Sequence, residues 1–373
     1  MMKIESGAKI DNYELLEHVG VGSSGEIWKA MGAGGQIVAI KFMRENLISS
    51  RSATKHRERL EREVNALKTL NHPNIPAIYE WDLESERPYF VMEFIDSPSL
   101  DKLILRGELV KQNIRKRLTI IKNVASALSL AHKNDIIHRD IKPGNINGVD
   151  KPYLMDFSIS LAAENRDMTN FNIGTSIYMP PDFEAPDAIG DAWSFAVVAY
   201  EILFGRHPIF DYDDPIIKKG MYARFAAKKR LDDGEWVKPT TIEDPQMPDD
   251  LKLADLEQLD AIFTKALGAR DVRYTDLTQF AEDIENAIFI SQNTVATAAD
   301  VEVAPMPDSA EDGAVGTLEA QAAPTGITTA AYSPTGQVVS NPASMLVLAF
   351  GVAMAIAVTL SIVLLAIAEF TNR

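Results

Sequence analysis

Short apolar runs are typical of the first hundred residues of this chain, and longer helical patterns follow them. The runs "YELLEHVG", "GEIWKAM", "QIVAIKFM" and "PYFVMEFI" have the length and alternation of β-strands. The segment "TKHRERLEREVNALKTLN" carries apolar residues at helical spacing: Leu60, Val64, Leu67 and Leu70. Further on, "IRKRLTIIKNVASALSLAHKN", "DAWSFAVVAYEILFG" and "LEQLDAIFTKAL" also predict helices. We therefore expect an α+β fold, with a β-rich lobe over about 10–95 and an α-helical lobe over about 96–290.

The composition changes after residue 290. Residues 291–343 are rich in Ala, Thr, Pro and Gly and contain six acidic residues but no Lys or Arg. Such a segment buries too little apolar surface to fold alone, so we expect a disordered acidic linker. Met345–Ala368 is an uncharged run of 24 residues. A bilayer is crossed by about 20 apolar residues, so this run predicts a transmembrane helix, followed by a short tail over 369–373. A buried core helix is the alternative.

Net charge and cysteine content exclude several classes of function. The chain of 373 residues has a formal charge of −16, which argues against nucleic-acid binding because that function needs a basic surface. The absence of cysteine excludes disulfides, thiolate catalysis and Cys-ligated zinc, and it fits a reducing compartment. The first twenty residues contain no apolar run of the kind found in secretory signals.

A glycine-rich stretch, "VGVGSSGEI", carries Gly20, Gly22 and Gly25 in the pattern G-x-G-x-x-G. Glycines allow backbone N–H groups to approach phosphate oxygens closely. In a dinucleotide-binding fold a helix would follow this pattern, whereas here strand-like runs continue. We therefore interpret the stretch as a hairpin that covers phosphates. An ordinary glycine-rich turn is the alternative.

The strand after this hairpin contains "VAIK", which places Lys41 on a short apolar run. A buried ammonium group needs a carboxylate partner, and the predicted helix over residues 54–71 offers Glu58, Glu61 and Glu63. The spacing to "NHPNI" favours Glu63. An edge-strand charge exposed to solvent is the alternative for Lys41.

The loop "IIHRDIKPGNI" concentrates charge and hydrogen-bonding groups within a few residues. It contains Arg139, Asp140, Lys142 and Asn145, together with a histidine. Asp, Lys, Pro, Gly and Asn are ordinary turn residues, so a solvated turn is one interpretation. The other is a loop that accepts a proton, neutralises a phosphate and holds a metal ion.

Nine short motifs occur in an order that resembles one known family. They are the glycine-rich loop, "VAIK", "REVNALKTLNHPNI", "VMEFI", "HRDIKPGN", "MDF", "GTSIYMPPD", "DAWSFA" and "RDVRY". Over about Tyr13 to Ile284 the chain resembles the eukaryotic-type (Hanks-type) serine/threonine protein kinases, which are also found in bacteria. The resemblance implies a bilobal protein kinase fold, with one αC-like helix in the β-rich lobe.

The resemblance also implies a reaction and its catalytic residues. Asp140 would accept or orient the proton of the substrate hydroxyl, and Lys142 would steady the transferring phosphoryl group. Lys41 and Glu63 would form the ion pair that holds the ATP phosphates. Magnesium, or manganese, would be held by Asn145 and Asp156. The implied partners are proteins with Ser or Thr acceptors.

The nucleotide site follows from the same resemblance. The backbone of Glu93–Ile95, after a gatekeeper-like Met92, would pair with adenine, and Asn147 would lie beneath the base. The residues implied to contact ATP are Val19, Gly20, Val21, Gly22, Ser23, Ser24, Gly25, Glu26, Ile27, Ala39, Lys41, Met92, Glu93, Ile95 and Asn147.

The resemblance also implies that phosphorylation of the activation loop regulates activity. Arg139, directly before Asp140, would receive a phosphate carried by Thr169, or by Thr175 behind it, once the activation loop is phosphorylated. An unmodified Thr169 is the alternative. Asp182 and Arg273 would form a structural ion pair.

Departures from the family pattern leave a second function open. Ser158 stands in place of the glycine of "DFG", Ala196 replaces another glycine, and Asn147 replaces an apolar residue. A pseudokinase or nucleotide-binding scaffold is therefore the main alternative, and a small-molecule kinase is a further one. Because ATP is cytosolic, we expect a cytoplasmic kinase domain on a single-pass C-terminal anchor in the bilayer. Small residues in the 345–368 segment are compatible with a homodimer.

Overall fold

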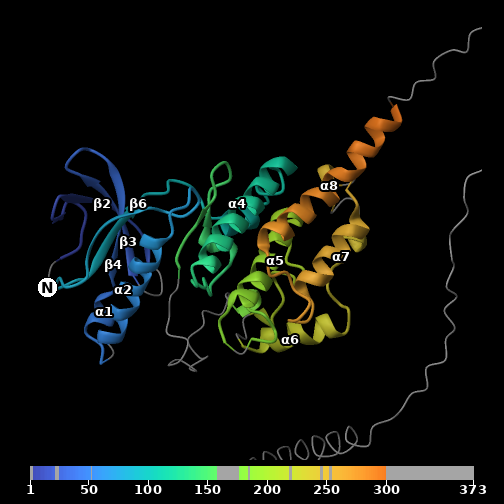
Figure 1. Ribbon diagram of the computed structural model, residues 1–373. Helices are drawn as coiled ribbons and strands as arrows, with labels where there is room; N and C mark the ends of the chain where they lie inside the picture. Colours follow the sequence, from blue (N-terminus) through green and yellow to red (C-terminus); the bar gives the residue numbers. More distant parts are fainter. Residues whose placement is uncertain are drawn as a thin grey trace, which may run out of the picture. The chain divides into compact units, whose positions relative to one another are not determined.

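The computed structural model of the chain is shown in Figure 1. It divides the chain into two units, Met1–Ala304 and Pro305–Arg373. The structure describes residues 3–21, 25–51, 53–157, 176–183, 185–217, 221–243, 247–251 and 254–299. All of these residues belong to the first unit.

A six-stranded antiparallel sheet forms the first part of the described fold (Figure 1). Its strand order is β1-β2-β3-β4-β6-β5. Strands β1 to β4 lie in chain order, β6 pairs with β4, and β5 lies at the edge of the sheet. The strands are β1 (Lys9–Ile10), β2 (Tyr13–Val21), β3 (Gly25–Gly32), β4 (Ile37–Met43), β5 (Ile78–Asp82) and β6 (Tyr89–Glu93). The four strand-like runs identified in the sequence all lie in this sheet.

The two faces of the sheet have different roles because successive side chains on a strand point to opposite sides. Trp28, Ile40 and Val91 on one face belong to a small core confined to this lobe. Ala39 and Met92 on the other face belong to the main core, which continues through the helical part of the chain. The second face is therefore the one that meets the rest of the molecule.

Two helices interrupt the sheet between β4 and β5: α1 (Glu45–Ile48) and α2 (Ala53–Thr69). In α2 the residues predicted to be apolar, Leu60, Val64 and Leu67, are buried in the main core. The prediction of one long helix in this lobe is therefore confirmed. The opposite face of α2 is polar, as expected for an amphipathic helix at the surface.

The helical lobe is organised around α5, which is buried from Gly190 to Phe204. The side chain of Asp187 caps its N-terminus by accepting a hydrogen bond from the Gly190 backbone N–H at 2.8 Å. Gly205 ends the helix with φ +67°, a left-handed conformation that favours glycine. Ala196 is buried in the middle of α5, so its extra methyl group is accommodated by the core.

In this lobe, α4 and α7 pack against α5, and α8 packs against α4 and α7 (Figure 1). The helices are α3 (Leu100–Leu105), α4 (Ile114–Lys133), α5 (Ala188–Phe204), α6 (Met221–Asp232), α7 (Leu256–Leu267) and α8 (Leu277–Ala299). A two-stranded sheet, β7 (Ile146–Asn147) and β8 (Tyr153–Leu154), follows a 3-10 turn, η1 (Pro143–Asn145). Further 3-10 turns among the described residues are η3 (Ser176–Tyr178), η5 (Pro239–Thr241) and η6 (Asp249–Leu251).

The predicted α+β organisation, a β-rich lobe before a helical lobe, is confirmed for the described residues. One predicted boundary differs. Helix α8 continues to Ala299, nine residues into the segment expected to be a linker. Gln292 and the alanines at positions 296, 298 and 299 are good helix formers, which explains this continuation.

The predicted membrane segment lies outside the described part of the chain. Within the residues that the structure describes, no helix has both the length and the apolar character needed to cross a bilayer. The run Met345–Ala368, the rest of the predicted linker and the tail over 369–373 all fall among the residues that are not described.

Candidate active site

The glycine-rich hairpin and the lysine strand meet on the sheet face that belongs to the main core. Ile27 on β3 pairs with Lys41 on β4, and Ala39 pairs with Met92 on β6. Directly paired residues of antiparallel strands point to the same side, so these four side chains share one face. Four of the residues predicted to contact ATP are thus brought together by strand register alone.

The hairpin itself approaches β4 closely at Gly25. A Cβ at this position would lie 2.7 Å from the Phe42 carbonyl oxygen, which explains why glycine is required here. The neighbouring Glu26 was predicted to contact ATP, but its carboxylate accepts a hydrogen bond from buried Arg87 at 2.7 Å. Glu26 therefore secures the base of the hairpin. The tip residues Gly22, Ser23 and Ser24 lie outside the described residues.

Three charged groups from distant parts of the chain meet at Lys41. Its Nζ lies 2.6 Å from Glu63 Oε1 on α2 and 3.0 Å from Asp156 Oδ1. Only 4% of Lys41 is exposed. Burial lowers the pKa of the Lys41 ammonium, but the nearby Asp156 and Glu63 carboxylates outweigh burial and raise that pKa above its ordinary value. The ammonium is therefore permanently charged. Among the glutamates considered for this pairing, Glu58 instead lies near Arg62 on the helix surface.

The pKa of the Asp156 carboxylate shifts in the opposite direction to that of Lys41. The adjacent Lys41 ammonium lowers the pKa of Asp156, while burial acts against that effect. Asp156 is thus ionised and available as an oxygen ligand. Its backbone has φ +52°, an uncommon conformation for a residue with a side chain, and such strain is frequent at functional sites.

The loop that carries Asp140 places three polar side chains in contact. Lys142 Nζ lies 2.6 Å from Asp140 Oδ2, and Asn145 Nδ2 donates to the same oxygen at 3.0 Å. The second carboxylate oxygen, Oδ1 of Asp140, is buried and has no hydrogen-bond partner among the described residues. A buried acceptor without a partner is costly, so this atom is suited to receive a donor from a ligand.

The same loop is tied to the segment that carries Asp156. The Met155 backbone N–H donates to the Asn145 carbonyl oxygen at 2.8 Å, and His138 Nε2 bonds to the Met155 carbonyl oxygen at 2.9 Å. Burial lowers the pKa of His138, which keeps this ring neutral and structural. Lys41, Asp140, Asn145 and Asp156 are therefore linked through a short chain of contacts.

Asn145 and Asp156 were predicted to hold a divalent cation, and the donor types fit that role. Mg²⁺ prefers oxygen ligands and commonly takes only one or two carboxylates from the protein. The amide nitrogen of Asn145 is bonded to Asp140, which leaves its amide oxygen as the ligand atom. The ionised Asp156 supplies the carboxylate.

The buried carboxylate of Asp191 on α5 positions the Asp140 loop. This role was not predicted from the sequence. Asp191 Oδ2 accepts the backbone N–H of His138 and Oδ1 accepts that of Arg139, both at 2.8 Å. His132 Nε2 also bonds to Asp191 Oδ2 at 2.9 Å. Arg139 has φ +73°, so these bonds hold the loop in a strained conformation. The motif "DAWSFA" was the available signal.

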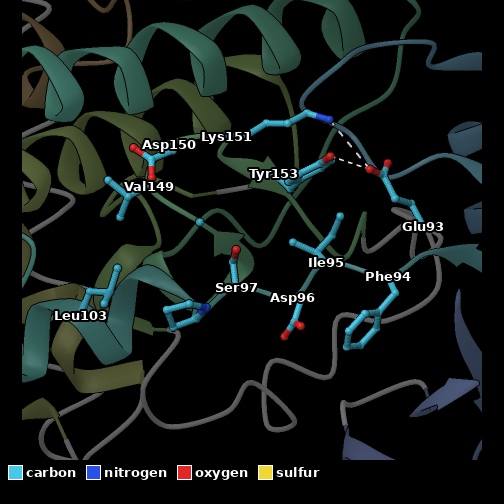
Figure 2. A pocket seen from close by; sticks show the side chains of 12 residues that line it. Glu93, Phe94, Ile95, Asp96, Ser97, Leu103, Val149, Asp150, Lys151 and Tyr153 are labelled. Carbon is cyan, nitrogen blue, oxygen red and sulfur yellow. Dashed lines mark hydrogen bonds and ion pairs between the residues drawn. The ribbon is translucent and has the colours of Figure 1, made fainter. Parts of the chain in front are cut away.

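Behind the predicted adenine-binding segment, the Glu93 side chain connects several elements. Tyr153 on β8 donates a hydrogen bond to Glu93 Oε1 at 2.5 Å, and Lys151 Nζ lies 3.9 Å from the same oxygen. Figure 2 shows these three side chains facing one another at a cavity of about 460 Å³ that Phe94 and Ile95 also line. The side chain of Glu93 is thus directed to β8, and only its backbone remains for a nucleotide.

Asn147, predicted to lie beneath the base in place of an apolar residue, carries an amide that needs a hydrogen-bond partner where it is buried. The structure gives it one, because Asn147 Nδ2 donates to the Ser97 carbonyl oxygen at 3.3 Å. Ser99 also forms an isolated bridge with Asn147. The amide thereby joins β7 to the segment that follows Glu93–Ile95.

Some of the other predicted site residues lie in the described part of the chain, and others lie outside it. Arg273 Nη2 lies 2.7 Å from Asp182 Oδ2, so these two residues form the expected ion pair. Ser158, Thr169 and Thr175 lie outside the described residues, and the proposed docking of a phosphate on Arg139 stays a prediction.

Helix α6 carries a cluster of basic residues near its C-terminal end. On α6, Lys228 lies 2.8 Å from Asp232, and Lys229 pairs with Asp233 one turn further along the helix. Arg230 lies 2.6 Å from Asp214. These local ion pairs are typical of a solvated helix face.

Comparisons with known proteins agree with this geometry. The family model described as "Protein kinase domain" matches residues 13–266. A probable serine/threonine-protein kinase of Streptomyces coelicolor is 32% identical over 304 residues, covering 77% of this chain and 41% of the relative. The serine/threonine-protein kinase PknB of Mycolicibacterium smegmatis is 32% identical over 293 residues, covering 74% of this chain and 42% of the relative.

A solved structure shows the same fold. The kinase domain of PknI from Mycobacterium tuberculosis superimposes with a TM-score of 0.51 at 20% identity, covering 77% of this chain and 100% of that domain. At this identity the likeness concerns the fold alone. The chain spans about two fifths of the length of the two curated relatives named above.

Proposed function

Because the chain belongs to the protein kinase family, we propose that it transfers the γ-phosphoryl group of ATP to Ser or Thr hydroxyls of proteins. The single observation that carries this proposal is the arrangement around Asp140. A buried, unpartnered carboxylate oxygen lies beside the Lys142 ammonium. A hydroxyl that donates to this oxygen would have its proton accepted and its attack directed.

The other charged groups have complementary tasks in this proposal. Lys41, fixed by Glu63, would hold phosphate oxygens of ATP, and Lys142 would neutralise charge that develops on the transferring group. The hydroxyl oxygen forms a bond to the γ-phosphorus while the bond to the bridging β–γ oxygen breaks, and ADP leaves. Magnesium, held by Asn145 and Asp156, would supply further positive charge at the phosphates.

The test compares two Asp→Asn variants of the full chain. Purified protein is incubated with labelled ATP and Mg²⁺, and phosphosites are identified by mass spectrometry. Asp140→Asn removes the proton acceptor without changing side-chain size, and phosphate incorporation should fall at least about 100-fold. Asp232→Asn removes a carboxylate that is 61% exposed on α6, outside this loop, and activity should remain.

The same experiment decides between a kinase and a pseudokinase. Ser158, in place of the usual glycine, is the sequence feature that favours the pseudokinase. If the wild-type chain binds ATP but incorporates no more phosphate than Asp140→Asn, the chain is a nucleotide-binding scaffold. Phosphate found on Ser or Thr of added protein substrates supports the kinase, and phosphate found at Thr169 or Thr175 supports control by autophosphorylation.

Membrane anchoring is a separate part of the proposal. The support is the uncharged run Met345–Ala368, which is long enough to cross a bilayer. The kinase domain would then lie in the cytoplasm, where ATP is found, and pairing of two such helices would favour homodimers. Full-length protein should sediment with membranes, and a form ending at Ser344 should not. Equal distribution of the two forms would refute the anchor.

A further inference from the structure

The segment that connects β5 to β6, residues 83–87, is bonded to the glycine-rich hairpin. Arg87, at the end of this segment, is buried, with only 5% of the residue exposed. Its Nη2 donates to Glu26 Oε1 at 2.7 Å, and its Nε donates to the Met43 carbonyl oxygen at 3.3 Å. The guanidinium also lies 5.8 Å from the centre of the Phe42 ring. A buried guanidinium is costly without a carboxylate partner, so the two charged side chains hold each other in place.

Glu26 belongs to the base of the hairpin formed by β2 and β3, and it pairs with Phe42 on β4. Its neighbour Gly25 packs directly on the side chain of Lys41, because a Cβ at Gly25 would lie only 3.0 Å from Lys41 Cγ. Arg87 therefore fixes the hairpin base at the place where the hairpin contacts the lysine assigned to the ATP phosphates.

Helix α2 binds the same connecting segment. Arg57 of α2 donates from Nη1 to the Leu83 carbonyl oxygen, and from Nη2 to the Ser85 carbonyl oxygen at 3.3 Å. Ser85 Oγ in turn donates to the Arg87 carbonyl oxygen at 2.9 Å. The segment is thus a short, internally bonded link between α2 and the hairpin.

Lys41 is supported by two elements that share this one anchor. Glu63 of α2 lies 2.6 Å from its Nζ, and the hairpin base packs on its methylene chain. Both elements are bonded to residues 83–87. A displacement of this segment would therefore shift both supports of the ammonium. A misplacement of about 1 Å at a reacting group can cost about 100-fold in rate.

We propose that the connection between β5 and β6 sets the position of Lys41 toward the ATP phosphates, with Arg87 and Arg57 as positioning residues for phosphoryl transfer. This inference rests on the proposed function and extends it to two arginines outside the assigned site. Arg87 acts through the hairpin, so it affects chiefly the binding of the triphosphate. Arg57 acts through α2 and Glu63, so it affects both ATP binding and turnover.

The first test separates the triphosphate from the base. Calorimetry on the full chain with Mg²⁺ measures the dissociation constants of adenylyl imidodiphosphate, a slowly hydrolysed ATP analogue, and of adenosine, which has no phosphate. Arg87→Met keeps the length of the side chain but removes its charge, and it should weaken binding of the analogue about 5- to 20-fold. Binding of adenosine should be unchanged. A merely structural role of Arg87 would weaken the binding of both ligands alike.

Matched variants assign this effect to the contact between Arg87 and Glu26. Arg87→Lys keeps a positive charge near Glu26 and should recover part of the affinity for the analogue. Glu26→Gln should weaken the analogue in the same selective way, and combining it with Arg87→Met should add little, because the same contact is lost in either case. Glu17→Gln is the control, since Glu17 is exposed on β2 in the same sheet. It should bind both ligands as the wild type does.

The second test examines the link to α2 by steady-state kinetics. Arg57→Gln shortens the side chain and removes its bonds to the connecting segment, so it should raise KM for ATP and also lower kcat, whereas Arg87→Met should act mainly on KM. The double variant should lose less kcat/KM than the product of the two single losses, because both arginines act through one segment. Thermal melting verifies that every variant is folded at the assay temperature.

Other results would overturn distinct claims. If Arg87→Met lost both ligands equally, or neither, the positioning role would be refuted and the proposed kinase function would stand. Losses that simply multiply in the double variant would refute the coupling through residues 83–87. A wild-type chain that binds neither ligand would refute the proposed function, and the positioning roles with it.

Discussion

The buried carboxyl of Glu201 predicts a stability that falls as pH rises. It is fully buried on α5, and burial raises its pKa from 4.5 to about 8. Between these two values the folded chain keeps a proton that the unfolded chain has already released. The free energy of unfolding therefore decreases with increasing pH in this range, by up to about 1.4 kcal/mol per pH unit.

The magnitude follows from the size of this shift. The rise in the pKa of Glu201 from 4.5 to about 8 changes the free energy of unfolding by roughly 5 kcal/mol. The free energy of unfolding is higher by this amount on the acidic side of the transition than on the alkaline side. The stability contribution is fully present below about pH 4.5 and is lost as pH rises through about 8. Glu201→Gln keeps the size and hydrogen-bonding capacity of the side chain but has no proton to lose.

The assay is denaturant unfolding at several pH values from acidic to alkaline. Trp193 and Trp236 are buried in the same lobe as Glu201 and report its unfolding by fluorescence. Near pH 5 the wild type and Glu201→Gln should differ by less than about 1 kcal/mol, since both side chains are neutral. Near pH 9 the Gln variant should be more stable by a few kcal/mol.

The control is Glu257→Gln, which removes an exposed carboxylate from α7 in the same lobe. Its stability should follow that of the wild type at every pH. If Glu201→Gln also remained parallel to the wild type from pH 5 to 9, Glu201 would not be neutral in the folded protein.

Three further predictions concern the active site. Lys41→Met should lower kcat/KM by about 100- to 1000-fold in the phosphate-incorporation assay, because the preorganised positive charge of the Lys41–Glu63 pair is removed. Activity within tenfold of the wild type would contradict the assigned role. Tyr153→Phe removes the donor to Glu93 and should raise KM for ATP several-fold while kcat changes little, as steady-state kinetics would show; an unchanged KM would mean that this contact does not position the adenine-binding segment. Asp191→Asn removes the charged acceptor of two backbone N–H groups, so it should lower the free energy of unfolding by about 2–3 kcal/mol and also lower kcat by a larger fraction. An equally stable and active variant would show that the Asp140 loop does not depend on this carboxylate.

Local patterns predicted the parts of the fold and the site that depend on neighbouring residues. Alternation of apolar and polar positions identified the strands, and helical spacing identified α2. The Lys41–Glu63 contact was predictable for a different reason. A buried ammonium needs a carboxylate, and only a few glutamates were within reach on the one helix predicted for that lobe.

Contacts between distant segments were not predictable in this way. Asp191 holds a loop 52 residues before it, and Glu93 is bonded to a tyrosine 60 residues after it. Nothing in the sequence around Asp191 shows that both of its oxygens will face backbone N–H groups. The identity of the partner depends on how α5 is placed, which only the assembled core determines. The contact of Glu26 with Arg87, 61 residues further along the chain, was not predictable for the same reason.

The anchoring of the Asp140 loop on α5 has a consequence for heat sensitivity. Ala196 and Tyr200, for example, are buried in the interior of the helix whose carboxylate holds the loop. Alleles that loosen this interior should lose turnover at temperatures where the chain as a whole is still folded. A genetic screen for thermosensitive loss of phosphoryl transfer should therefore recover substitutions within α5 as readily as substitutions in the loop.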